Sequence, residues 1–204
     1  MLKNIYSNTL LIICIVLLVI SCSKDDPDPV HEHEVFTRVV LEVKKDGETD
    51  YKKYTFEIED DHEHGHEDHD DEDHDDDHDE HGGEHTEVEL ATNSSYHVGI
   101  FFYNDSDPDN IEDVTLEVIE EADAHQVFYE MTEISGFEIV AAADDTKDSN
   151  GNPLLLKTTW TTKSEGSGDV MAYLIHEPTT KTGTTRTDFG GAIDVQIEFE
   201  VHIE

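Results

Sequence analysis

The sequence has few positive charges, few cysteines and no long apolar run. Its 204 residues include 12 Lys and Arg against 51 Asp and Glu, which gives a formal net charge of −39. A surface this acidic cannot neutralise phosphates, which argues against a nucleic-acid partner. It also argues against charge-driven docking on anionic lipid. It attracts cations instead, either metal ions or basic partners.

The longest apolar run, residues 10–20, is too short for a membrane-spanning helix, which needs about 20 residues. It follows a basic residue, Lys3, and is typical of a signal-peptide core. It ends in "VISC", which resembles a loose bacterial lipobox. We therefore expect residues 1–21 to be a lipoprotein signal peptide and Cys22 to carry the lipid; the alternative is a plain secreted protein. Cys14 leaves with the peptide, so the mature chain has no pair for a disulfide.

A polar, Pro-containing tether, residues 22–33, follows the lipidated cysteine. Its first residues, "CSKDD", resemble the export sequence of surface lipoproteins in Bacteroidota. The resemblance implies a lipid anchor in the outer membrane and a protein that faces the cell surface. A periplasm-facing lipoprotein is the alternative.

The remaining chain, 34–204, is predicted to be one mainly β domain, an antiparallel β-sandwich of the Ig-like or Greek-key type. Residues 35–44 and 51–59 predict two strands, joined by a turn at Asp46-Gly47. The closing "GAIDVQIEFEVHIE" alternates from Ile193 to Ile203, which predicts one face in the core and one in water. In residues 110–131, "DVTLEVIEE" alternates like a strand, whereas "EEADAHQVFYEM" could form a short helix or turn. Trp160, the only Trp, is predicted to lie in the core or half-buried.

Residues 60–85 interrupt these strands with only four residue types: 15 carboxylates, 8 histidines and 3 glycines. We call this segment the His/Asp-rich loop. It has no apolar residue to bury, so we expect it to be disordered on its own. Loops this long in compact domains are usually functional or disordered.

The histidines of this loop are the candidate metal ligands, because imidazole binds borderline transition ions and an acidic spacer would not need it. Spacings of two, three and four residues let a flexible chain place several imidazoles around one ion, and neighbouring carboxylates can complete the shell. Imidazole with carboxylate suits Zn(II), and Cu(II) or Ni(II) are possible. An inert acidic spacer and a carboxylate-only calcium site are the alternatives. The candidate ligands are His62, His64, His66, His69, His74, His78, His81 and His85.

Other motifs are weaker. "DTKDSNGNP" partly matches a calcium-binding loop, but Thr146 occupies the first ligand position and Lys157 the twelfth, so a plain hairpin loop is expected. His97, His125 and His176 lie in strand-like segments and are interpreted as structural histidines. The sequence has no nucleophile elbow, HExxH motif, phosphate loop or Ser/His/Asp signature, and we expect no enzyme activity.

Three stretches resemble a group of small Bacteroidota lipoproteins loosely labelled type 1 periplasmic binding fold proteins. They are "EDVTLEVIEEADAHQVFYEM", "DSNGNPLLLKTTWTT" and "GGAIDVQIEFEVHIE". The resemblance implies an accessory of an outer-membrane TonB-dependent receptor and assigns no ligand residues. The fold named in that label is α/β, whereas the strand pattern here favours an all-β domain.

Together these observations predict a lipid-anchored β-sandwich that captures or buffers transition-metal ions through its His/Asp-rich loop. The alternative is an extracytoplasmic module that binds a glycan, haem or a protein, with the loop as a solvated spacer.

Overall fold

The computed structural model describes residues 34–58, 86–132 and 134–204. Residues 34–204 form one compact unit. The predicted signal peptide, Cys22, the tether and the eight histidines of the His/Asp-rich loop all lie outside the described residues. No helix in the described ranges is long and apolar enough to cross a membrane.

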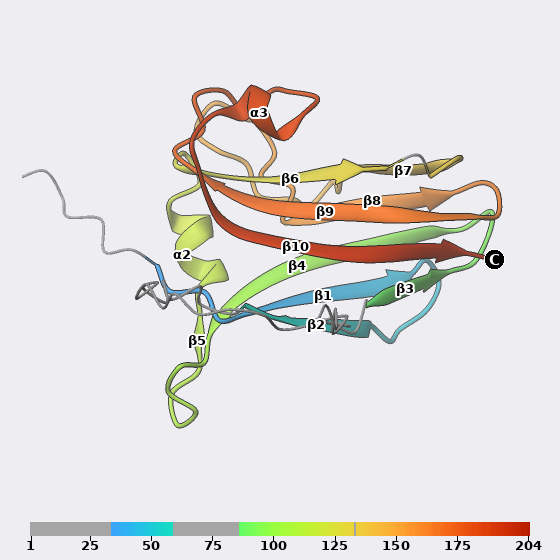
Figure 1. Ribbon diagram of the computed structural model, residues 1–204, viewed down its shortest axis with the longest axis horizontal. Helices are drawn as coiled ribbons and strands as arrows, with labels where there is room; N and C mark the ends of the chain where they lie inside the picture. The colour runs from blue at the N-terminus through green and yellow to red at the C-terminus, as the bar shows by residue number, and fades with distance from the viewer. Residues whose placement is uncertain (1–33, 59–85, 133) are drawn as a thin grey trace, which may run out of the picture. The chain divides into compact units, whose positions relative to one another are not determined.

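The described chain is mainly β, as predicted, and its strands form two sheets (Figure 1). The elements in chain order are β1 (Arg38–Lys45), β2 (Lys52–Glu57), β3 (Glu87–Leu90), β4 (Ser95–Asn104), β5 (Glu112–Asp113), α2 (Thr115–Glu120), β6 (His125–Met131), β7 (Phe137–Ala141), β8 (Lys157–Thr162), β9 (Gly166–His176), α3 (Arg186–Phe189) and β10 (Ala192–Ile203).

The first sheet has the order β2-β1-β4-β8-β7, with the short β5 paired to β4, and the second has the order β3-β10-β9-β6. Neighbouring strands are antiparallel, as predicted, except that β3 runs parallel to β10. The chain changes sheets between these strands: β2 is an edge strand of the first sheet, and the next strand, β3, joins the edge of the second sheet. The His/Asp-rich loop lies between these two edge strands in sequence.

Aromatic side chains from both sheets pack between them. Trp160 of β8 is fully buried, as predicted, and stacks on Phe199 of β10, with ring centroids 5.9 Å apart and an interplanar angle of 7°. Tyr129 of β6 and Phe137 of β7 meet the same indole edge-on, at 6.4 Å and 5.4 Å. Such pairs add about 0.5–1.5 kcal/mol each beyond the apolar area they bury. They therefore help to hold the two sheets face to face.

The alternation predicted for β10 holds except at its first member. Val195, Ile197, Phe199, Val201 and Ile203 are buried, at 5% exposure or less, but Ile193 is 46% exposed. The cause is a bulge, since Ile193 pairs with Ile175 and Val195 with the next residue of β9, Leu174. The extra residue between them is Asp194. A bulge re-aims the side chains on either side of it, and this one takes Ile193 out of the core.

The segment that the sequence left ambiguous differs in part from its pattern. The strand-like alternation around residues 114–120 belongs to α2. In the stretch that could form a short helix or turn, residues 121–124 form a turn and residues 125–131 form β6. Val114, Thr115 and Val118 are buried, which is a helical spacing, while Leu116 is 59% exposed. Val114 and Val118 lie on one face both in a strand, with its period of two, and in a helix, with its period of 3.6. The pattern therefore does not separate the two structures, and the packing of the helix against the core decides between them.

The outer face of the second sheet is covered near one end. Phe128, Tyr173, Ile175 and Phe189 form a second apolar cluster there, and α3 lies over β6 and β9 in Figure 1. Phe189 of α3 contacts Phe128 at a centroid distance of 4.7 Å. At this end of the second sheet, β6 and β9 thus pack against the core on their inner face and against α3 on their outer face.

We predict that the sandwich folds without the His/Asp-rich loop. Most of the apolar core residues of the described chain lie on the two sheets, and the sequence of the loop has no apolar residue. Replacing residues 60–85 with a short Gly/Ser linker should keep the β-type circular dichroism and a single cooperative unfolding transition, with equal or higher stability because like-charge repulsion falls. A broad, non-cooperative transition would show instead that the loop is structural.

Candidate metal centre

Two histidines lie side by side at one end of the second sheet. His125 is the first residue of β6 and His176 the last of β9, and the two pair directly in the antiparallel register. They share the strand face of Val127 and Leu174, which belong to the core between the sheets. Their imidazole rings stack 4.9 Å apart with an interplanar angle of 10°. Strand pairing thus places two imidazoles at the border of the core.

The bulge in β10 brings a carboxylate to the same place. Asp194, the extra residue of the bulge, has Oδ2 3.9 Å from Nε2 of His125 and Oδ1 3.8 Å from Nδ1 of His176. In an unbroken strand this residue would alternate outward with Gln196. The bulge is therefore the local feature that puts Asp194 beside both imidazoles.

A second carboxylate comes from the chain segment that leads into β1 of the first sheet. Oε2 of Glu34 lies 3.2 Å from Nε2 of His125, and the Glu34 side chain is only 8% exposed. The segment is held by Phe36, which is 7% exposed and packs edge-on against Phe102. Glu34 is thus placed against a residue 91 positions away in sequence.

The orientation of the His125 ring is set by a contact of its Nδ1 atom, on the side away from Glu34 and Asp194. Its Nδ1 lies 3.2 Å from the backbone carbonyl oxygen of Glu121, just after α2. A carbonyl can only accept, so Nδ1 donates the hydrogen. In the neutral imidazole this leaves the lone pair on Nε2, which is the atom that faces Glu34 and Asp194. A backbone carbonyl is one of the usual partners of the second ring nitrogen of a metal-binding histidine.

The electrostatics of the site favour an added cation. Burial, together with the nearby carboxylates of Glu117, Asp194 and Glu121, raises the pKa of Glu34 to about 7. Burial lowers the pKa of His125, which favours its neutral form. Near neutral pH the cluster therefore contains a neutral imidazole among carboxylates that repel one another. A bound cation would offset both the burial and the repulsion.

Two overlapping groups of side chains could hold a metal ion. They are His125, His176 and Asp194, and Glu34, Glu121 and His125; within each group the possible ligand atoms lie within 4.8 Å of one another. Imidazole nitrogen with carboxylate oxygen suits Zn(II), Cu(II) or Ni(II) better than calcium or magnesium, which prefer oxygen alone. We call His125, His176, Asp194 and Glu34 the candidate metal centre.

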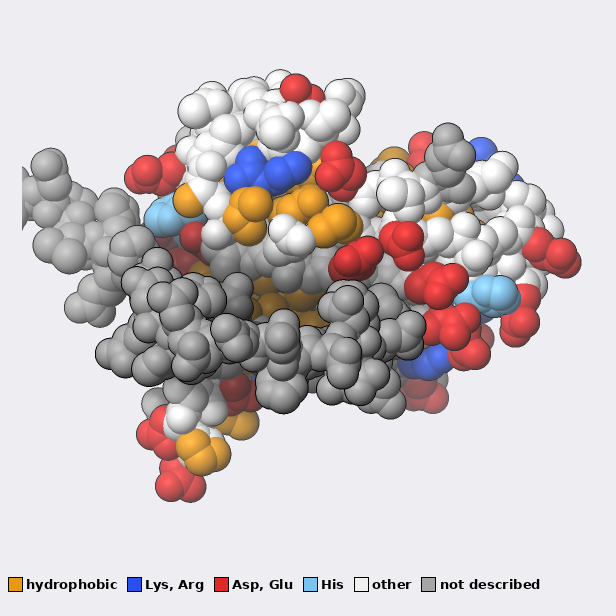
Figure 2. Space-filling view, viewed as in Figure 1, with side chains coloured by type: hydrophobic (Ala, Val, Ile, Leu, Met, Phe, Trp, Pro, Cys, Tyr) orange, Lys and Arg blue, Asp and Glu red, His pale blue; other side chains and the backbone are white. Residues whose placement is uncertain are grey.

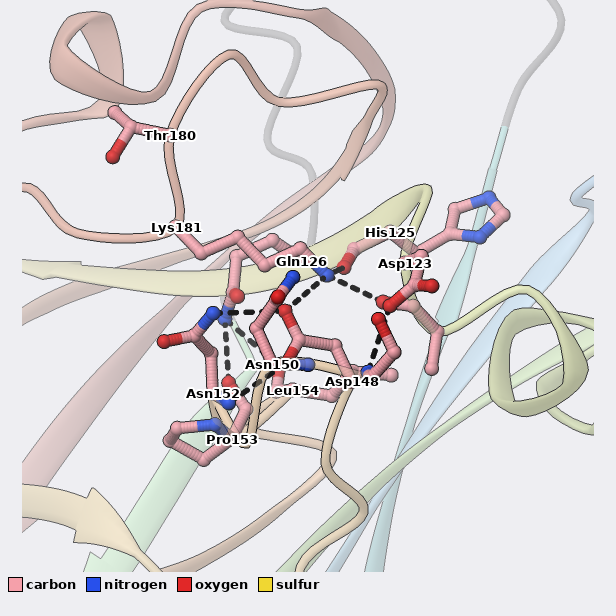
Figure 3. A network of polar contacts seen from close by, with 12 residues as sticks. Asp123, His125, Gln126, Asp148, Asn150, Asn152, Pro153, Leu154, Thr180 and Lys181 are labelled. Atoms are coloured by element: carbon pink, nitrogen blue, oxygen red, sulfur yellow. Dashed lines mark hydrogen bonds and ion pairs between the residues drawn. The ribbon is translucent and has the colours of Figure 1, made fainter.

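A buried lysine braces the backbone that carries His125 (Figure 3). Nζ of Lys181 donates to the carbonyl oxygen of His125 at 2.7 Å and to that of Ala122, and lies 3.6 Å from Oδ2 of Asp148. The side chain of Lys181 is 9% exposed. The imidazole of His125 points away from this network. Lys181 therefore positions the histidine through its main chain.

The weak calcium-loop motif forms a hairpin-type turn, as expected. Oδ1 of Asp148 accepts hydrogen bonds from the backbone N–H groups of Asn150 and Asn152, and Lys147 bridges to Pro153. The carboxylate that would have been a calcium ligand is thus used to close the turn and to pair with Lys181.

Of the three histidines interpreted as structural, two lie in the candidate metal centre. His97 does not: its Nε2 lies 3.0 Å from Oδ1 of Asp144, an exposed residue. No sequence signal joins His125 to His176, since they are 51 positions apart and meet only through the β6–β9 register. The eight histidines of the His/Asp-rich loop and Cys22 stay predictions, because they lie outside the described residues.

A surface pocket of about 540 Å³ lies elsewhere, near the β1–β2 turn, and three of its lining residues are Tyr51, Tyr54 and Tyr96. The ammonium groups of Lys44 and Lys52 lie over the rings of Tyr51 and Tyr54, at 4.7 Å and 5.1 Å. One face of each of these rings is therefore already covered by a cation.

Acidic side chains are spread over the face of the molecule seen in Figure 2.

No protein-family model matches the chain, and no curated protein matches it. The candidate metal centre therefore depends on its geometry alone.

We predict that Lys181→Met lowers the free energy of unfolding by about 1–3 kcal/mol, because two backbone carbonyls lose a buried donor. Lys157→Met is the matched control: its Nζ pairs at 3.1 Å with Asp144 on the exposed surface, and its loss should cost about 0.5 kcal/mol. Urea unfolding of the two variants measures the difference. Equal effects would show that the Lys181 network does not brace the fold.

Proposed function

We propose that the protein is a lipid-anchored protein of the outer membrane, facing the cell surface, that captures or buffers transition-metal ions through its His/Asp-rich loop. Zn(II) is the proposed cargo, with Cu(II) or Ni(II) as the other candidates. Its proposed partner is a TonB-dependent receptor, to which it would be an accessory. The proposal includes no catalytic role.

The observation that carries the proposal is the composition of residues 60–85, where 8 of 26 residues are histidine and 15 are Asp or Glu. Solvation and charge repulsion need only the carboxylates. The imidazoles add affinity for borderline ions that carboxylates lack. Many overlapping ligand sets in one segment favour binding of several ions, which suits capture and buffering better than catalysis at one fixed ion.

The candidate metal centre supports the same proposal from an independent direction. It combines imidazoles and carboxylates within the described residues, and it is formed by folding and not by local sequence. Both sets combine the ligand types that suit the same group of metals.

A second candidate function is a ligand-binding or adhesion module for a glycan, haem or a protein. The tyrosine-lined pocket favours it, since ligand sites are concave and rich in aromatic side chains. The lysines over Tyr51 and Tyr54 reduce the ring surface open to stacking. We therefore favour metal capture.

The histidines of the loop should carry most of the Zn(II) binding. Replacing all eight with Asn should remove most of the bound equivalents in calorimetry and leave the carboxylates to hold Ca(II) weakly. Protons compete with metal for imidazole, and the ordinary pKa of histidine is about 6.5. Wild-type binding should therefore weaken as the pH falls from about 7 to 6. Equal Zn(II) stoichiometry in the two proteins would favour the spacer interpretation of the loop.

Membrane attachment should depend on Cys22. Cys22→Ala should abolish incorporation of labelled fatty acid and move the protein from the membrane fraction to the soluble fraction. Cys14→Ala is the matched control and should keep both the lipid and the membrane attachment. If the Cys22→Ala protein stays in the membrane fraction, the lipid anchor is the wrong interpretation.

A further inference from the structure

We infer that the folded domain contains its own site for one transition-metal ion, separate from the His/Asp-rich loop, with His125, His176, Asp194 and Glu34 as ligands. This inference deepens the proposed function, because it assigns a fixed, single-ion site to a protein proposed to hold many ions in a flexible segment.

Each of the four side chains belongs to one of two overlapping groups that share His125, and the ligand atoms within each group lie within 4.8 Å of one another. A tetrahedral zinc ion with bonds of about 2.0–2.2 Å holds its ligand atoms about 3.3–3.6 Å apart. The contacts here are 3.2 Å between Glu34 and His125, 3.9 Å between Asp194 and His125, and 3.8 Å between Asp194 and His176.

The site is built and not accidental. His125 is fully buried, and the side chains of Glu34, Asp194 and His176 are 8%, 17% and 21% exposed. The carbonyl of Glu121 orients the His125 ring from behind, and Lys181 holds the backbone of the same residue. Surface carboxylates that gather by chance lack a buried imidazole with such support.

An ion at this place would join the two sheets. Glu34 belongs to the segment that leads into β1 of the first sheet, whereas His125, His176 and Asp194 belong to three adjacent strands of the second sheet. The described part of the chain has no disulfide that could make such a link, since both cysteines lie outside it. A bound metal is therefore a cross-link between the sheets at this end of the sandwich and should stabilise the fold.

The test requires a chain without competing imidazoles. The background protein is the full mature chain in which the eight histidines of the His/Asp-rich loop and the two histidines of the tether, His31 and His33, are replaced by Asn. Zn(II) alone is the probe, at neutral pH. The background protein should bind one equivalent in calorimetry. Its unfolding midpoint should rise by about 5–10 °C when free Zn(II) is 100 times the dissociation constant.

Two substitutions in the background test the ligands. His176→Asn and Asp194→Asn are partly exposed positions, so the fold should survive, and each should weaken Zn(II) binding at least about tenfold. His97→Asn is the matched control, since His97 also pairs with a carboxylate but lies outside the centre. It should leave binding unchanged. Co(II) gives a further readout, because a four-ligand site produces the strong visible absorption of tetrahedral cobalt, and His176→Asn should remove it.

The two proposals fail in different ways. If the background protein binds no Zn(II), or if His176→Asn and Asp194→Asn bind as well as His97→Asn, the folded site is overturned whatever the loop does. If the wild type binds no more equivalents than the background protein, the loop proposal fails and the single site stands. Circular dichroism of each variant confirms that a loss of binding is not a loss of fold.

Discussion

The contact between the two sheets is the constraint on which the rest of the structure depends. Sheets that pack face to face lie about 10 Å apart, and their inner side chains must fill that space. Here the stacked pair of Trp160 and Phe199 fills its centre. The packing determines which residues face inward on every strand, and so it also determines that His125 and His176 face inward at the end of the second sheet.

At that end the inner layer changes from apolar to polar over one residue pair. Val127 and Leu174 are buried among hydrophobic neighbours, and the next inward pair is His125 and His176. Burying polar groups costs free energy unless each has a partner. The partners come from three separate places: the carbonyl of Glu121, the bulged Asp194 and the buried Glu34. The candidate metal centre exists because the sandwich ends its core with imidazoles instead of apolar side chains.

The sequence predicted the parts of this structure that depend on local pattern. The β class, the Asp46-Gly47 hairpin, the alternation of β10 from Val195 onward and the burial of Trp160 all follow from period-two spacing or turn chemistry. It missed α2 because residues 114 and 118 fit the period of a strand as well as the period of a helix. It missed the candidate metal centre because that centre needs a bulge at Asp194, a register between distant strands, and a contact that spans 91 positions. None of these leaves a motif in the sequence.

Strand register also relates the two sets of candidate ligands. Glu57, at the end of β2, pairs with Arg38 at the start of β1, and the N–H of Ile58 donates to the carbonyl of Thr37 at 2.8 Å. Glu34 lies only three positions before Thr37. Ile58, the last described residue before the His/Asp-rich loop in the sequence, therefore lies beside the segment that carries Glu34. The chain then has two sets of ligands for the same metals, and the loop set has more histidines than the folded site. The two sets must compete for each ion. A titration of the intact chain reports the sum of both sets, and only removal of the loop imidazoles isolates the affinity of the folded site.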